Sequence, residues 1–356
     1  MSKNDNLPEM QGPVCPLPLT HADQIVIGHG SGGRMTADLI ERTFYPPFDN
    51  PELLVGDDSA VLELSGFGRM AVSTDSHVVS PLFFPGGDIG RLAVCGTVND
   101  LAMVGATPRW LTASFILEEG LHLETLERVL QSMKAAALEA GIIIVAGDTK
   151  VAERGKADQI FITTSGIGLI PEGRHVSGRN AKVGDSVLLS GPIGDHGIAV
   201  LAARGQLDFD AQVESDIAPL CKLTEGLFER GLDVHVMRDP TRGGLATTLN
   251  EIARQSDVLI ELNEDQIPVR PAVEAACEML GFDPLYVPNE GKLVAILPEE
   301  DAEAALAVMH DLPYGEDACR IGLVGESPTG RVLMHTAIGG TRVVDILAGE
   351  MLPRIC

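Results

Sequence analysis

The chain is poor in basic residues. Only 26 lysines and arginines stand against 51 aspartates and glutamates in 356 residues, which gives a formal net charge of −25 at pH 7. Nucleic acids and anionic membranes both bind through clustered basic side chains, so this balance argues against either as a partner. A small anionic ligand is compatible with it, because backbone N–H groups, a few basic residues and metal ions can build such a site.

Cysteine pairs and long apolar runs are also missing. The six cysteines form no CxxC pair and no Cys/His cluster with zinc-ligand spacing, a pattern typical of a reducing compartment. No apolar run reaches the roughly 18 residues of a transmembrane helix, and the N-terminus lacks the apolar core of a signal peptide. We therefore predict a cytoplasmic protein with no membrane contact.

What the sequence does contain is a regular alternation of strand and helix patterns. At roughly 100–200 residues per domain, a chain of this length favours two domains. Residues 24–180 alternate between the two patterns, which predicts an α/β domain, and residues 181–342 alternate again. Residues 1–23 are rich in proline and polar residues, which predicts a mobile arm. Residues 343–356 contain glycine and proline and end in a cysteine, which predicts a flexible tail.

Local patterns and the residues that interrupt them predict the individual elements. The clearest helix is residues 121–140, an amphipathic segment closed by Gly141. Strands are predicted at 70–74, 110–117, 142–145, 160–170, 187–189, 234–237, 258–262, 292–297 and 320–324. Further helices are predicted at 89–104, 197–204, 216–230, 243–255, 271–280 and 300–311.

Two groups of residues suggest a phosphate site with a metal ion. The first is the loop GHGSGG at residues 28–33, whose four glycines let backbone N–H groups converge on an anion. It is not a Walker A loop, because no lysine follows, and a flexible surface turn is the alternative. The second is a set of aspartates beside Gly, Ser, Thr or Asn: Asp57, Asp58, Asp75, Asp100 and Asp148.

Gathered carboxylates of this kind are typical Mg²⁺ ligands. For any single aspartate a cap or a turn is the better interpretation, but five in one half of the chain favour a metal–phosphate site.

Three further features carry possible chemistry. In RDPTRGG at residues 238–244, Pro240 holds Asp239 extended and the following helix N-terminus would favour an anion, although a plain helix start explains the motif as well. Lys150 and Glu290 are single charged residues in glycine-containing loops, and each alone is more typical of a surface. Cys356 places a thiol on the terminal arm, where it would be exposed and reactive, or is accidental.

Together these motifs resemble the HypE family of hydrogenase maturation factors, which are carbamoyl dehydratases. The matching stretches are GHGSGG at 28–33, GDDSAV at 56–61, STDSHVV at 73–79, residues 83–108, GDTKV at 147–151, RDPTRGGLA at 238–246, PNEGK at 288–292 and PRIC at 353–356. The glycine and aspartate motifs are shared with aminoimidazole ribonucleotide synthetase, thiamine-monophosphate kinase and selenophosphate synthetase. The terminal PRIC singles out this family, and the resemblance covers about residues 24–356.

The resemblance implies a fold and an activity. It implies an N-terminal α/β domain whose sheet pairs with that of a second subunit, a C-terminal α+β domain of ferredoxin-like layout, and a homodimer that holds ATP and Mg²⁺ in a cleft between the domains. A carbamoyltransferase, HypF, would load a carbamoyl group on Cys356. ATP would then drive dehydration of this S-carboxamide to an S-cyanide, and the cyanide would pass to iron held by a HypC–HypD complex.

The resemblance also assigns roles to residues. By family position Asp57, Asp58, Asp75, Asp100 and Asp148 would hold Mg²⁺ and phosphates, with Asn99 and Asp239 beside the nucleotide and Gly30, Ser31, Gly32 and Gly33 over the phosphates. Glu290 and Lys150 are candidates for proton handling at the amide nitrogen, and which one is the base stays open. His29 and His77 are further polar candidates, with a structural role as the alternative.

Alternatives stay open for the position of the tail and for the overall activity. Fourteen extended residues could span about 50 Å, so we expect an inward tail for dehydration and an outward tail for loading and delivery. A small-molecule kinase or synthetase with the same aspartates would not need the terminal cysteine. A non-catalytic carrier would bind ATP without covalent change at Cys356.

Overall fold

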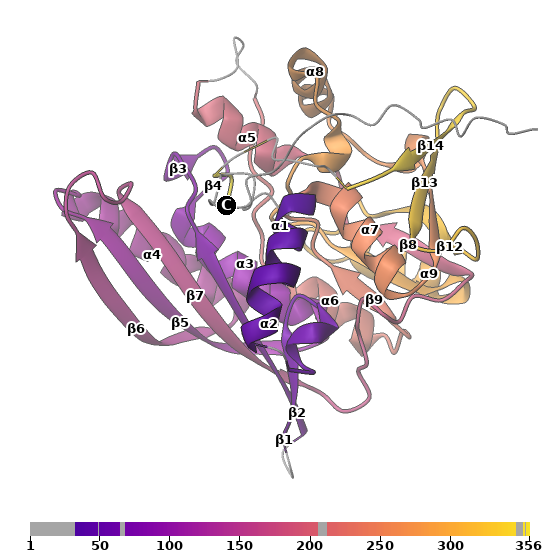
Figure 1. Cartoon of the computed structure of the whole chain (residues 1–356), viewed down its shortest axis with the longest axis horizontal. Coiled ribbons are helices and arrows are strands. Elements are labelled where there is room, and N and C mark those ends of the chain that lie inside the picture. Colours follow the sequence, from indigo (N-terminus) through magenta and orange to yellow (C-terminus); the bar gives the residue numbers. More distant parts are fainter. Residues whose placement is uncertain (1–32, 49, 65–67, 206–211, 347–351, 353) are drawn as a thin grey trace, which may run out of the picture.

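Two large β-sheets with helices packed against them make up the computed structural model of the chain (Figure 1). The structure describes residues 33–48, 50–64, 68–205, 212–346, 352 and 354–356. Among the helices of these residues, none combines the length and the apolar character that a membrane span requires. Two short helices, α1 (Arg34–Leu39) and α2 (Tyr45–Phe48), precede the first sheet.

The first sheet has five strands in the order β1-β2-β7-β5-β6. They are β1 (Ala60–Leu64), β2 (Gly68–His77), β5 (Thr107–Glu118), β6 (Ile143–Ala152) and β7 (Ile160–Ile170). All neighbours are antiparallel except β5 and β6, which the crossover helix α4 (Leu123–Ala140) joins in parallel. The helix α3 (Ile89–Met103) lies with α4 on one face, and a two-stranded ribbon, β3 (Phe83–Phe84) and β4 (Gly87–Asp88), leads into it.

Helix α3 is the central helix of the molecule. Asp88 caps its N-terminus by accepting hydrogen bonds from the backbone N–H groups of Gly90 and Arg91, at 2.7 and 3.2 Å. Nearly all its residues are buried, because it packs against the first sheet on one side and the second domain on the other. This position carries Asn99 and Asp100 to the junction of the two domains.

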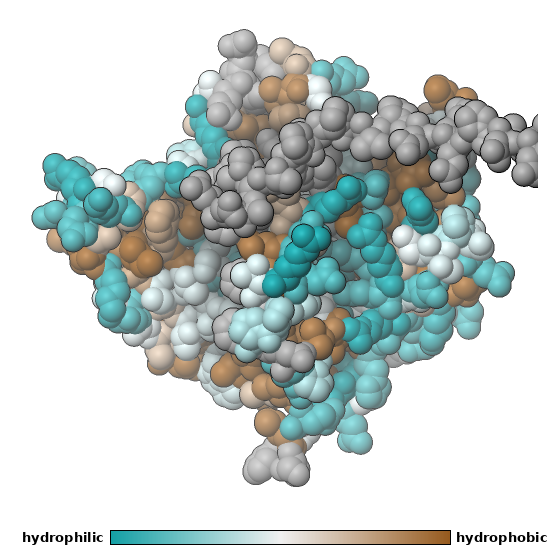
Figure 2. All heavy atoms as spheres, viewed as in Figure 1, coloured by the Kyte–Doolittle hydropathy of each residue, from teal (hydrophilic) through white to brown (hydrophobic). Residues whose placement is uncertain are grey.

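The other face of the first sheet is open and partly apolar. Trp110, Ile116, Ile143 and Leu169 are between 39% and 61% exposed, and apolar side chains gather at the left of the molecule in Figure 2, over the strands β5 and β6 of Figure 1. Strand β6 is an edge strand of ten residues, and all but its last residue are exposed. A long, exposed apolar edge of this kind is typical of an interface.

The second sheet has seven strands in the order β14-β13-β10-β12-β8-β11-β9. They are β8 (Asp185–Leu189), β9 (Val236–Arg238), β10 (Leu259–Asn263), β11 (Val294–Pro298), β12 (Cys319–Gly325), β13 (Arg331–His335) and β14 (Thr341–Val344). Its helices are α5 (Asp195–Ala203), α6 (Cys221–Glu229), α7 (Gly244–Gln255), α8 (Pro271–Leu280) and α9 (Ala302–His310). Val187 of β8 packs with α7 and its neighbour Leu188 packs with α6 and α9, so both faces are covered.

The coarse prediction of two domains with mixed α/β content is confirmed, but several local predictions are not. The predicted helix 216–230 is wrong in its first turn, because α6 begins only at Cys221. The preceding residues are held in loop conformation by contacts with other segments, such as the Leu220 N–H donated to Asn99 Oδ1 at 2.8 Å. Strands β1, β13 and β14 were not predicted. The boundary at 180 and the ferredoxin-like layout stay predictions.

The predicted tail differs at its start. Val343 and Val344 form the end of β14, and Val344 is buried. The described residues at the end of the chain, 352 and 354–356, lie between the two domains (Figure 1).

Candidate active site

Three carboxylates meet where the two domains join. One oxygen from each of Asp58, Asp100 and Asp239 lies within 4.8 Å of the other two. Asp58 precedes β1, Asp100 is near the end of α3, and Asp239 follows β9. We call these three residues the carboxylate triad. Three segments far apart in the sequence therefore deliver oxygen ligands to one point, as a divalent cation requires.

Burial makes the carboxylate triad electrostatically costly. Burial raises the pKa of Asp100 well above its usual range, and the charges of Asp239, Asp75 and Asp58 raise it further, while the Ser73 hydroxyl donates a hydrogen bond at 2.6 Å that opposes the shift. The pKa of Asp239 is raised by burial and then by Asp58. Like charges this close favour either protonation or a bound cation.

Arg238 ties the aspartate loop of the first domain to the second domain. This buried side chain donates to Asp58 Oδ1 at 2.8 Å and to the Gly56 carbonyl at 2.7 Å, and it lies 3.8 Å from Asp57 Oδ1. Asp57 also accepts the backbone N–H of Gly178 at 2.8 Å. Asp57 is therefore held by protein groups, and it is not part of the triad.

A second charged group lies beside the triad. Asp75 of β2 has Oδ2 at 3.6 Å from His77 Nε2 and Oδ1 at 3.9 Å from Arg242 Nη2. His77 is buried, and neither ring nitrogen has a hydrogen-bond partner among the described residues. Its pKa is lowered by burial, which keeps the ring neutral.

Glu290 is a buried acid with an unpartnered oxygen. It precedes β11 and is 4% exposed, and its Oε1 has no hydrogen-bond partner among the described residues. Burial raises its pKa well above the usual range, the charges of Asp75 and Asp239 add to this, and Arg242 opposes it. A carboxyl group with a raised pKa is a stronger base, which suits proton abstraction near neutral pH.

Asn99 positions the segment that carries Glu290. Its amide donates to the carbonyls of Ala218 and Glu290 at 3.0 and 3.5 Å, and its carbonyl oxygen accepts from Leu220. The side chain, predicted to lie beside the nucleotide, is thus used to hold two loops of the second domain against α3.

The end of the chain is docked inward. Leu352 and Ile355 are buried in the core beside α5, and Cys356 packs against the same core. Backbone oxygens of the last three residues accept hydrogen bonds: that of Arg354 from the N–H of Ser80 at 3.3 Å, that of Ile355 from His196 Nε2 at 2.8 Å, and a terminal oxygen of Cys356 from the N–H of Val78 at 3.0 Å. The described end of the chain is therefore docked against the core, and the inward and outward tail states of the reaction stay predictions.

Arg354 and Arg204 fasten the tail from both sides. Arg354 donates to the Val78 carbonyl at 3.1 Å and pairs with Asp158 at 2.6 Å. Arg204 donates to the carbonyls of Ser80 and Arg354.

Removing one of these contacts should expose the terminal thiol. Hydrogen bonds to charged groups contribute about 1.5–3 kcal/mol, so Arg204→Met should raise the rate at which Cys356 reacts with a maleimide about tenfold. Peptide mass mapping would locate the label. Arg230→Met, an exposed arginine at the end of α6, is the control and should leave the rate unchanged. Equal labelling of Arg204→Met and the unmodified protein would contradict the role of Arg204.

Arg242 is a candidate site residue to which the sequence motifs assigned no role. The charge of Cys356 is the largest cause that raises the pKa of its guanidinium, and Asp75, Glu290 and Asp100 also contribute. It thus lies among the terminal cysteine, the candidate base and the acidic residues. The signal was present in RDPTRGG, where only Asp239 was assigned a role.

Several predicted residues lie elsewhere. Gly30, Ser31, Gly32 and His29 are outside the described residues, and Gly33 is at the start of α1. Asp148 and Lys150 are exposed on the edge strand β6, where they pair with each other at 2.8 Å. In β2-β7-β5-β6, three strand spacings of about 4.8 Å separate β6 from Asp75.

The faces of the sheet also separate these residues. Ser76, Thr163, Ser114 and Asp148 are successive register partners and share the open face, whereas Asp75 is on the face covered by α3. Asp148 and Lys150 therefore do not join the triad within one chain.

Comparison with known proteins defines the class. The family model described as AIR synthase related protein, N-terminal domain, matches residues 56–170, and the corresponding C-terminal domain matches residues 182–335. The chain is thus an AIR synthase-related protein with both domains of that class.

Individual similar proteins show which family within this class the chain matches. The chain is 55% identical to carbamoyl dehydratase HypE of Cupriavidus necator, over 94% of this chain and 95% of that protein. A crystal structure of a HypE–HypF complex has a TM-score of 0.83 at 51% identity, covering 87% of this chain and 99% of that chain. Hydrogenase maturation protein HypE in complex with ATP has a TM-score of 0.79 at 53% identity, covering 94% and 100%. The chain therefore belongs to the HypE family of carbamoyl dehydratases of hydrogenase maturation, as its motifs predict.

Proposed function

We propose that this chain uses ATP to dehydrate an S-carboxamide on Cys356 to an S-cyanide, which becomes the cyanide ligand of a hydrogenase iron centre. The observation that supports the proposal is the docked end of the chain, whose terminal cysteine interacts electrostatically with Arg242, as Glu290 does. The related structure with ATP supports nucleotide binding, and the acidic site between the two domains is the place we propose for its phosphates.

The carboxylate triad fits a magnesium ion. It offers three oxygens within 4.8 Å of one another, and burial raises the pKa of each of its carboxyl groups in the absence of a cation. Bound there, Mg²⁺ would neutralise charge on the phosphates during phosphoryl transfer. Asp58, Asp100 and Asp239 would hold the ion, and we propose that Asp57 and Asp75 support the site through Arg238 and Arg242.

The side chains around Cys356 can carry out the proton chemistry. A carboxamide oxygen is a poor leaving group, and its phosphorylation gives an iminophosphate that loses phosphate to form the nitrile. We propose that Glu290 takes a proton from the amide nitrogen, because its buried Oε1 has no hydrogen-bond partner among the described residues and its pKa is raised. Arg242 supplies a positive charge beside the reacting group. Buried surroundings strengthen both effects.

The mass of the intact protein tests this function. Carbamoyl-loaded protein should lose one water on addition of Mg-ATP, with the change located at Cys356 and one ADP formed for each water lost. Cys356→Ala should show no change because it has no thiol to load. ATP turnover that persists in Cys356→Ala, with no mass change in the unmodified protein, would instead favour a small-molecule kinase. Binding of ATP with neither change would favour a carrier.

We also propose that the chain forms a homodimer through the open face of the first sheet. The exposed apolar side chains and the unpaired edge strand β6 support this. Pairing there would bring Asp148 and Lys150 against a second copy, which is the way we propose they reach an active site. The general base is then either Glu290 of one chain or Lys150 of another.

A charge placed in the apolar face should separate the subunits. Ile143 is 61% exposed and pairs with Trp110, so Ile143→Asp should weaken dimerisation at least about tenfold, as measured by sedimentation. Ile338→Asp is the matched control, since Ile338 is 96% exposed between β13 and β14, away from the first sheet. A monomeric unmodified protein, or equal dimerisation of both variants, would refute the interface.

Partners follow from the proposed reaction. The related HypE–HypF complex supports a HypF-type carbamoyltransferase that loads Cys356. We propose a HypC–HypD complex as the recipient of the cyanide, since the product must reach iron. Both exchanges require the outward tail, and the half-buried pair Arg354–Asp158 is a contact that a partner could replace.

A further inference from the structure

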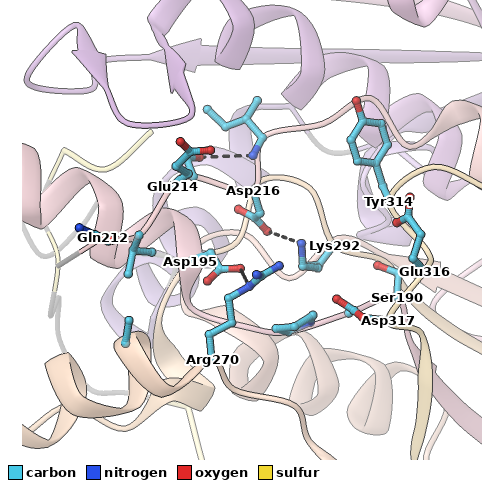
Figure 3. Close-up of a pocket in the computed structure, with 16 residues that line it drawn as sticks. Ser190, Asp195, Gln212, Glu214, Asp216, Arg270, Lys292, Tyr314, Glu316 and Asp317 are labelled. Carbon is cyan, nitrogen blue, oxygen red and sulfur yellow. Dashed lines mark hydrogen bonds and ion pairs between the residues drawn. The ribbon is translucent and has the colours of Figure 1, made fainter.

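A second cavity, the rear cavity, lies behind the segment that carries Glu290. Its volume is about 400 Å³, and none of its lining residues belongs to the carboxylate triad or the tail (Figure 3). Five carboxylates, those of Asp195, Glu214, Asp216, Glu316 and Asp317, line it against two basic side chains, Arg270 and Lys292. Such a lining favours protons and other cations and repels a phosphate product.

A thin wall separates this cavity from Glu290. The N–H of Glu290 donates to Asp216 Oδ1 at 3.1 Å, and the Glu290 carbonyl accepts from Ala218 at 3.4 Å. A side chain at Gly291 would collide with the Asp216 carbonyl, 1.8 Å away, so only glycine permits this approach. Asp216 thus binds the backbone of Glu290 on one side and lines the rear cavity on the other.

Asp216 and Lys292 form a buried ion pair in this wall. Their side chains are 2% and 9% exposed, and Lys292 Nζ lies 3.2 Å from Asp216 Oδ2, as the dashed line in Figure 3 shows. Removing both charges from water is costly, so such a pair is weak evidence for stability and invites a functional explanation. The charged and titratable groups around Asp216 are Lys292, Asp195, Glu290 and His196.

Asp195 lines the rear cavity as well. Its Oδ2 accepts from Arg270 at 3.0 Å, but its buried Oδ1 has no hydrogen-bond partner among the described residues. Burial raises the pKa of Asp195 to about 6, with Asp216 adding to the shift and Arg270 opposing it. A carboxyl group of this kind can both accept and release a proton near neutral pH.

The proposed reaction produces a proton that must leave. An S-carboxamide and ATP give an S-cyanide, ADP, hydrogen phosphate and one proton, so one of the two N–H protons departs with the phosphate and the other goes to solvent. Because the tail and the nucleotide would fill the front of the site, the proton on Glu290 needs another path to solvent. Resting on the proposed function, we propose that Asp216, Lys292 and Asp195 pass this second proton from Glu290 to the rear cavity.

Single-turnover dehydration tests this outlet. Full-length protein loaded with the carbamoyl group is mixed with Mg-ATP, quenched rapidly, and analysed for loss of water at Cys356. Asp216→Asn should slow the loss about tenfold or more without changing ATP affinity. Free imidazole, which can enter the rear cavity, should restore the rate, whereas imidazole linked to dextran should not. Asp317→Asn, at the exposed rim of the same cavity, is the control and should match the unmodified protein.

The double variant Asp216→Asn/Lys292→Gln is the control for misfolding of Asp216→Asn. It replaces the ion pair by a neutral pair of similar size. It should be equally slow and equally restored by free imidazole. Unchanged rates in both variants would overturn the outlet, as would a slowed rate that free imidazole does not restore. If the unmodified protein loses no water, the proposed function itself fails, and this is seen before any variant is compared.

Discussion

Glu290→Gln should slow dehydration about 10²–10⁴-fold, the usual contribution of a general base. Glutamine keeps the size of the side chain but cannot take a proton from the amide nitrogen. In rapid-quench mass measurements, the carbamoyl group on Cys356 should therefore persist after Mg-ATP is added. Loading of the carbamoyl group should be unaffected, because the Glu290 carboxyl is assigned only to the dehydration step.

The same variant should be no less stable than the unmodified protein. Glu290 is buried near Asp75 and Asp239, and these charges oppose its ionisation, so a neutral amide removes repulsion. Thermal melting checks that the loss of activity is not a loss of fold. Glu225→Gln, which affects the pair with Arg174 and a hydrogen bond from Thr107, should keep dehydration within about twofold. Full dehydration by Glu290→Gln would assign the base to another group, with Lys150 of a second chain the remaining candidate.

Arg238→Met should lower the free energy of unfolding by about 3–5 kcal/mol, measured without Mg²⁺. The substitution keeps much of the side-chain volume but removes the positive charge beside Asp58 and Asp57, both of which stay buried. It also leaves the Gly56 carbonyl without this donor. The melting temperature should fall by roughly 5 °C, and saturating Mg²⁺ should recover part of the loss by occupying the triad.

A neighbouring arginine provides the control. Arg179 donates to the carbonyls of Leu54 and Val55 in the same loop, at 2.5 and 2.9 Å, but it is exposed. Arg179→Met should cost less than about 1 kcal/mol because water can replace its hydrogen bonds. A similar loss in both variants would show that the loop contacts, and not the charge on Arg238, hold the two domains together.

The individual elements show how far local sequence information extends. Helix α4 was predicted because its apolar residues recur at helical spacing and Gly141 ends it in the left-handed conformation, with a φ of 71°. Both signals are local. Strand β14 gives no such signal, because three of its four residues are exposed and only its pairing with β13 defines it. The segment before α6 was misassigned for the same reason, since Asn99, far away in the sequence, fixes its conformation.

In the candidate site, too, some features follow from local sequence and others only from tertiary contacts. The sequence alone determined the family, because RDPTRGG, PNEGK and the terminal PRIC are contiguous motifs that can be read without a structure. It also supplied Glu290 and Cys356 as candidates. Only the tertiary structure decided that Asp58, Asp100 and Asp239 converge while Asp57 is bound by Arg238 and Gly178. All these aspartates have similar local surroundings, so no pattern of neighbours distinguishes a ligand from a structural carboxylate.

Burial is the physical reason for this division. A motif records which residue types are present, whereas the pKa of Glu290, the docking of the tail and the ion pair of Asp216 depend on groups brought together by long-range packing. Desolvation and charge–charge interactions act over a few ångströms in space, regardless of separation along the chain. The sequence therefore determined the class of chemistry, and the packing of the two domains decided which side chains are placed to perform it.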